Sequence, residues 1–331
     1  MKIVPGQFAR ALPELLSALL MLASLLLLSA CRKTENAVAI IPRTTATILW
    51  EPMHLGATEA ARLAGLRIYW NAPAYEGDTN KQLSLFEACR AKGYRGFIFV
   101  PDETQAARTA VLQAVSDHVP VVIVDDDLGP DPGPYLSYVQ NDEQAGVELA
   151  AERIAHLLPR GGVIAILGIS SHIESGVTRE EAFEEALARR APAVRVSVRR
   201  FGDFVVTHQQ QLAEQILSGP DPIDALVTLS GTATRGAFYA KVAAEPRSTV
   251  PIVGFDQDML LPIQTGDVDA VVVQNTREIG RLAMNNLDVQ LHGGQVQGLT
   301  KVQPLLLTRQ TINSPEIERL WEFTTYHWSE P

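Results

Sequence analysis

Acidic, amide and aromatic side chains follow the apolar runs of this sequence, at the positions where buried strands are expected to end. In VPIVGFDQD (250–258), for example, a run of apolar residues leads directly to Asp256 and Asp258. Carboxylates and amides form hydrogen bonds with pairs of hydroxyl groups, and aromatic rings cover the apolar faces of a sugar ring. Residues of this kind at the expected strand ends are Trp50, Glu51, Asp125, Asp126, Phe201, Ser230, Phe255, Asp256 and Gln274. Each alone is more simply read as a helix cap or a loop residue, but their convergence indicates a site for a small polyhydroxy ligand.

The elements that must position these residues alternate along the chain. From residue 44 onwards, short apolar runs are separated by amphipathic stretches, which is typical of βαβ units in a parallel sheet. Strands are expected at 44–50, 66–70, 96–100, 119–125, 162–168, 194–201, 224–229, 250–256, 268–274 and 302–312. Helices are expected at 56–65, 80–93, 103–118, 143–158, 178–190, 208–219, 232–245 and 277–293. Ligands of such sheets bind outside the carboxyl ends of the strands, where the candidate residues lie.

Two stretches of the chain are similar to each other. VPVVIVDDD (119–127) and VPIVGFDQD (250–258) each follow a helix and a short loop, begin with Val-Pro and end in acids. This similarity suggests two related halves. We therefore expect an α/β fold in which two lobes each contain a doubly wound parallel sheet.

The order and spacing of several segments carry a family resemblance that covers residues 44–312. The segments are FIFVPDETQAARTAVLQAVSDHVPVVIVDDD (97–127), VQNDEQAG (139–146), SGVTREEAFEEAL (175–187), VPIVGFDQD (250–258) and VDAVVVQNTREIG (268–280). Together they resemble the type I periplasmic binding proteins, specifically the ribose/galactose-type group, which shares its fold with the effector domains of LacI-type repressors. The resemblance implies that Arg179 reaches the ligand, that Asp256 bonds sugar hydroxyls and that Gln274 contributes a glutamine on the hinge side.

The same resemblance implies how the chain divides into lobes. The first lobe is expected to comprise 44–141 and 275–306, and the second 142–274 and 307–313. Three crossovers, near 140–143, 274–276 and 306–308, would form the hinge. The remaining tail, 314–331, is expected to form a short helix that packs on a lobe, and a partner-binding role is the less favoured alternative.

Three departures from the family pattern bear on the ligand. Asp126 stands where an arginine often follows the aspartate, and Ser230 stands where an asparagine is common. The link from the expected first strand to its helix is short, so Trp50, Glu51 or His54 would replace the usual ligand-binding loop. Because the resulting site is rich in acids, we expect a neutral sugar or polyol, including one with an amino group, rather than a sugar acid.

The N-terminus has the features of an export signal. An apolar run over 15–28 follows Lys2 and Arg10 and ends at Leu28-Ser29-Ala30-Cys31, which looks like a bacterial lipobox. We expect lipidation at Cys31, a polar tether from there to residue 43, and a lipid-anchored location at the cell envelope, either periplasmic or on an outer membrane face. An ordinary secretory signal or an uncleaved anchor is the alternative. Since Cys89 is the one other cysteine, neither a disulfide nor a cysteine-based metal site is expected.

Charge and motifs narrow the functional class. A formal net charge of −10 argues against nucleic acid as a partner. The sequence contains no GxSxG, HExxH, P-loop or strand-linked GxGxxG motif, so neither an enzyme nor a cofactor is expected. The leading hypothesis is a monomeric solute-binding lipoprotein that delivers a sugar to an ABC-type permease. A ligand-binding partner of a membrane signalling receptor is the alternative, and an enzyme acting on carbohydrate is less favoured.

Overall fold

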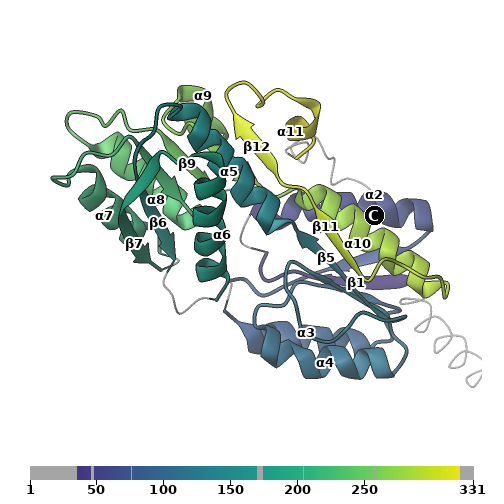
Figure 1. Cartoon of the computed structure of the whole chain (residues 1–331). Helices are drawn as coiled ribbons and strands as arrows, with labels where there is room; N and C mark the ends of the chain where they lie inside the picture. The colour runs from purple at the N-terminus through teal and green to yellow at the C-terminus, as the bar shows by residue number, and fades with distance from the viewer. Residues whose placement is uncertain are drawn as a thin grey trace, which may run out of the picture.

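The protein forms two α/β lobes, which lie side by side in the computed structural model (Figure 1). The structure describes residues 36–45, 48–75, 77–169, 174–203, 205–255 and 258–320. Within these residues there are two sheets of six strands each, and every strand pairing is parallel except that of the last strand of the second sheet. The expected fold class is therefore confirmed.

Lobe A is built on the first sheet, sheet A, and its helices cover both faces. The strand order is β11 (Leu299–Val302), β5 (Leu136–Asn141), β4 (Val121–Val124), β3 (Phe97–Phe99), β1 (Ala37–Ile41) and β2 (Arg67–Trp70). The helical elements are the 3₁₀ turn η1 (Ile48–Trp50), α2 (Glu51–Ala64), α3 (Thr79–Ala91), α4 (Thr104–Ser116) and α10 (Thr276–Leu291).

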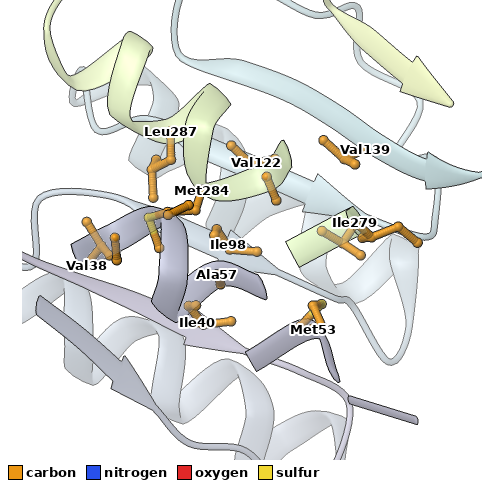
Figure 2. Packing of buried hydrophobic residues seen from close by; sticks show 14 of the residues in the cluster. Val38, Ile40, Met53, Ala57, Ile98, Val122, Val139, Ile279, Met284 and Leu287 are labelled. Carbon is orange, nitrogen blue, oxygen red and sulfur yellow. The ribbon is translucent and has the colours of Figure 1, made fainter. Parts of the chain in front are cut away.

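Both faces of sheet A are buried, which explains its continuous apolar strands. Side chains alternate along a strand, so Val38 and Ile40 of β1 face one layer of helices and Ala39 and Ile41 face the other. Figure 2 shows the first layer, where α2 and α10 pack over the sheet. Its labelled members are Val38, Ile40, Met53, Ala57, Ile98, Val122, Val139, Ile279, Met284 and Leu287.

Lobe B repeats this arrangement on the second sheet, sheet B. The strand order is β12 (Leu305–Thr308), β10 (Ala270–Val273), β9 (Ile252–Phe255), β8 (Ala225–Thr228), β6 (Gly162–Ile169) and β7 (Val194–Gly202). The helices are α5 (Glu143–Leu157), α6 (Glu174–Arg190), α7 (Val206–Leu217), α8 (Gly231–Ala243), α9 (Leu260–Thr265) and α11 (Pro315–Leu320). Residues of α5 and α6 pack on one face of the sheet, and those of α7 and α8 pack on the other.

The first strand lies earlier in the chain than the sequence predicts. Residues 37–41, inside the expected tether, form β1 between β3 and β2. The predictions of a tether through residue 43 and of a strand over 44–50 were therefore wrong. AVAII is a short apolar run closed by Pro42, which lacks the N–H that would continue the ladder, whereas ILW at 48–50 turns directly into α2. The link between β1 and α2 is correspondingly longer than expected.

The end of the fold also differs from the prediction. The expected strand over 302–312 contains β12 of sheet B, whereas its first residue, Val302, ends β11 of sheet A, so the third crossover lies at Gln303 and Pro304 rather than at 306–308. The other two crossovers join β5 to α5 and β10 to α10. β5 and α9 were not anticipated. The start of the tail forms α11, in which Ile317 and Leu320 are buried in lobe B.

Several predictions concern residues that the structure does not describe. The export signal and Cys31 lie before residue 36, and the tail beyond Leu320 also lies outside the described residues. In the part that is described, none of the helices is both long and apolar enough to span a bilayer. Cys89 is a buried free thiol among the apolar residues under α3 and α4, as expected for a small hydrophobic side chain.

Candidate functional site

One arginine joins three strand ends of sheet A. Arg43, which follows β1, forms an ion pair with Asp126 and lies 3.2 Å from Asp125 Oδ2 through its Nη2 atom. Its Nε donates a hydrogen bond of 3.0 Å to the carbonyl of Pro101, which follows β3. Asp125 and Asp126 were predicted site residues, and the structure places both of them against Arg43. Arg43 was missed, because both β1 and the residues that follow it, up to 43, were expected to form a tether.

Asp125 is held in an unusual environment. Its φ is +73°, a left-handed conformation that aspartate and asparagine tolerate better than most side chains. Burial raises the pKa of its carboxyl, and the carboxylates of Asp126 and Glu143 raise it further, while Arg43 and Arg179 act against them. Since Glu143 and Arg179 belong to lobe B, this electrostatic coupling indicates that the two lobes approach each other beside Asp125.

The two tryptophans near the strand ends of lobe A differ in exposure, since Trp50 is buried and Trp70 is partly exposed. Trp50 is only 1% exposed, and its ring centroid lies 5.9 Å from the Arg43 guanidinium carbon. Trp50 therefore packs below the arginine rather than presenting an open face. Trp70, at the end of β2, stacks on His54 with ring centroids 4.3 Å apart. Glu51 lies 3.9 Å from His54, so Glu51 and His54 are neighbours at the start of α2.

A second charged cluster lies in lobe B. Arg179 of α6 donates two hydrogen bonds. One runs from its Nε to the Glu143 carboxylate at 2.8 Å, and the other from its Nη1 to the carbonyl of Leu229 at 2.9 Å. Its guanidinium carbon is 5.0 Å from the centroid of Phe255, at the end of β9. Arg179 and Phe255 were both predicted, and they are in contact. Glu143 was not singled out, although it lies in the VQNDEQAG segment that the family resemblance had marked as hinge-crossing.

The remaining predicted residues have varied surroundings. Ser230 is the N-cap of α8, where its Oγ accepts from the Ala233 N–H at 3.1 Å. Phe201 is 39% exposed on the edge strand β7. Gln274 lies at the crossover between β10 and α10, next to the N-cap residue Asn275. Asp256, the strongest candidate from the sequence, falls outside the described residues.

Among the described residues, neither a surface hollow nor a group of metal-ligating side chains offers an alternative to these strand ends as the candidate site. A surface hollow of about 570 Å³ lies between the C-terminal ends of α7 and α8 and the entrance to β9, at the opposite end of sheet B, and contains none of the predicted residues. No group of three or more His, Cys, Asp or Glu side chains in the described ranges is placed to hold a metal ion.

Comparisons with known proteins bear on the family and the fold. Residues 38–295 match the family described as "Periplasmic binding protein domain". The chain is 27% identical to the ribose import binding protein RbsB of Bacillus subtilis (strain 168), over 87% of this chain and 96% of that protein. It is 25% identical to the D-allose-binding periplasmic protein of Escherichia coli (strain K12), over 83% of this chain and 91% of that protein. A sugar-binding protein of a sugar ABC transporter from Bacillus halodurans has the same fold, with a TM-score of 0.78 at 18% identity over 84% of this chain and 99% of that one.

Proposed function

This chain belongs to the periplasmic binding protein domain family, and we propose that it captures a small sugar between its lobes and delivers it to an ABC-type permease. The observation that carries the proposal is the meeting of Arg43, Asp125 and Asp126 at the carboxyl edge of sheet A, electrostatically coupled to Arg179 and Glu143 of lobe B. The names of the relatives, which are binding proteins for ribose and allose, support a sugar ligand and a non-catalytic role.

The arrangement suits reversible capture of hydroxyl groups. Carboxylates accept hydrogen bonds and guanidinium groups donate them. An ion pair of the two can therefore bind both hydroxyl groups of a diol while neither group changes its charge. Three crossovers join the lobes, at 141–143, 273–276 and 302–305. We propose that small backbone rotations at these crossovers close the lobes around the sugar, as in hinge closure generally. The closed form would then be the one that the permease recognises.

The first test is a thermal-shift screen of residues 32–331 against pentoses, hexoses, amino sugars, polyols and nucleosides. A ligand present at 100 times its Kd stabilises the folded state by about 2.7 kcal/mol, which shifts the unfolding temperature measurably. We expect at least one neutral sugar to stabilise the protein. If no sugar does so, the proposed function is wrong, and if a sugar is converted to product, the protein is an enzyme.

The second test concerns Asp256, which the family resemblance assigns to the sugar. Asp256→Ala should abolish the shift caused by the best sugar and leave the unfolding temperature of the sugar-free protein nearly unchanged. Asp131→Ala is the matched control, since Asp131 is an exposed acid in a loop of lobe A. Sugar affinity that survives in Asp256→Ala would remove this residue from the site.

We also propose that Cys31 carries a lipid that anchors the protein at the cell envelope. The lipobox-like LSAC sequence supports this, since it follows an apolar run of signal-peptide length. Cys31→Ser should move the expressed protein from the membrane fraction to the soluble exported fraction, and intact-mass analysis should lose the lipid adduct. A Cys89→Ser variant, in which the buried thiol is changed instead, should stay with the membrane.

A further inference from the structure

We propose that Arg43 contacts the ligand directly and that the cluster of Arg43, Asp125 and Asp126 selects neutral sugars over sugar acids. This inference rests on the proposed function and deepens it by assigning a selectivity to the site. It also assigns the role to a residue outside the segments that carry the family resemblance.

The position of Arg43 depends on the order of strands in sheet A. β3 lies between β1 and β4, so the ends of β1 and β4 are separated by two strand spacings, or about 10 Å. The long arginine side chain and the two acidic side chains together bridge this distance. Its Nε is fixed by the Pro101 carbonyl at the end of β3, and its Nη2 reaches both acids beyond β4. The guanidinium is thus held on the edge of the sheet where ligands of such folds bind.

The cluster is held firmly but stays accessible. The side chains of Arg43, Asp125 and Asp126 are 23%, 16% and 29% exposed, so each can still meet a ligand. Below them, the Trp50 ring supports the guanidinium through a cation–π contact. The indole N–H of Trp50 is buried and has no hydrogen-bond partner within the described part of the chain. A buried donor of this kind calls for a bound water or ligand group nearby.

The charges of the cluster determine the selectivity. One guanidinium faces two carboxylates, which leaves one negative charge when both acids are ionised. Arg179 and Glu143 compensate each other in the neighbouring cluster, so they do not cancel this excess. The hydroxyl groups of a neutral sugar can accept hydrogen bonds from Arg43 and donate hydrogen bonds to the two carboxylates. A sugar acid would bring a second negative charge into the same space and would compete with the acids for Arg43.

The experiment measures affinity by calorimetry for D-ribose, D-allose and D-galactose, and for D-galacturonate as the sugar acid. We expect the unaltered protein to bind at least one neutral sugar, and to bind it at least about tenfold more tightly than D-galacturonate. Arg43→Gln should lower the affinity for that sugar at least about tenfold. Arg43→Lys should recover only part of the loss, because lysine keeps the charge but not the planar fork of donors.

Asp126→Asn tests selectivity separately from folding. This near-isosteric change removes the excess negative charge, so the preference for the neutral sugar over D-galacturonate should fall by about tenfold. Arg95→Gln is the matched control, since Arg95 forms an exposed pair with Asn36 at the amino end of sheet A. It should leave all affinities unchanged.

The outcomes distinguish this inference from the proposed function. If the protein binds a neutral sugar but Arg43→Gln binds it equally well, only the role of Arg43 is overturned. If D-galacturonate binds as tightly as the neutral sugars, the proposed selectivity is overturned while sugar binding stands. If none of the four compounds binds and the wider screen is also negative, the proposed function falls and this inference falls with it.

Discussion

At the scale of single residues, Asp125 combines two features that bear on stability and binding. Its backbone is left-handed, with φ at +73°, and its carboxyl is largely buried, with charged groups of both lobes acting on it. Burial raises the pKa of this carboxyl, so the folded state holds the proton more tightly than the unfolded chain. The stability contributed by Asp125 therefore falls as the pH rises through its raised pKa. Such a residue is better explained by a role in the site than by a role in folding.

Two substitutions separate the backbone effect from the charge effect at this position. Asp125→Asn keeps a residue that tolerates the left-handed conformation and removes the buried charge. It should raise the unfolding temperature at neutral pH and flatten its dependence on pH. Asp125→Ala removes the same charge but adds backbone strain, so it should be less stable than the asparagine variant by about 1–2 kcal/mol. Thermal unfolding across pH 4–8 checks both, and equal stability of the two variants would contradict the strain argument.

At the scale of elements, α2 and α10 approach so closely that glycines form the contact. A Cβ atom added at Gly280 would lie 2.0 Å from the Met53 carbonyl oxygen, and one added at Gly56 would lie 1.9 Å from that of Arg277. Both neighbours are backbone atoms, which cannot move without separating the helices. This contact joins the helix that begins beside the predicted site to the helix that begins at the hinge.

Gly280→Ala should therefore destabilise the protein. Alanine in place of a helical glycine normally stabilises by about 0.5–1 kcal/mol, but here the added methyl group overlaps the backbone of α2. We expect a net loss of at least about 1–3 kcal/mol in the free energy of unfolding, measured by urea denaturation. Gly146→Ala in α5 is the matched control, because its Cβ would lie no closer than 3.4 Å to a neighbour. The control should be neutral or stabilising, and a tolerated Gly280→Ala would show that the helices can separate.

At the scale of the whole molecule, α11 links the two lobes by a hydrogen bond, in addition to the three crossovers of the chain. Ile317 and Leu320 are buried in lobe B, but the carbonyl of Arg319 accepts a hydrogen bond of 2.6 Å from Arg277 of α10 in lobe A. Arg277 also forms an ion pair with Glu59 of α2. Figure 1 shows α11 beyond β12, on the side of the molecule where α2 and α10 lie. α11 thus contacts the start of α10, next to the crossover at 273–276.

Two variants of this bracing contact can be compared. Arg277→Gln removes the bond to α11 and the ion pair with α2, whereas Glu59→Gln removes only the ion pair. Amide hydrogen exchange over 315–320 should therefore accelerate in Arg277→Gln and stay unchanged in Glu59→Gln. Equal exchange in the two variants would mean that α11 is held by its apolar contacts alone.

Local patterns in the chain predicted its fold class and most of its elements. The alternation of apolar runs with amphipathic stretches depends on neighbouring residues, so it predicted most helices and strands and the two parallel sheets. Acids after apolar runs marked Asp125 and Asp126, and the family segments marked Arg179 beside Phe255. The same reasoning failed at AVAII, because a short apolar run next to a polar N-terminal segment carries little periodic signal.

Contacts across the fold were beyond such reasoning. Arg43 and Asp126 are separated by 83 positions and meet only because β3 lies between their strands and their side chains together can span that gap. Glu143 and Arg179 meet because α5 and α6 pack on the same face of sheet B. Trp50 follows an apolar run like the other candidates, yet packing buries it in the core of lobe A. Local periodicity specifies which residues end a strand, whereas strand order and helix packing determine which of those residues touch and which remain accessible to a ligand.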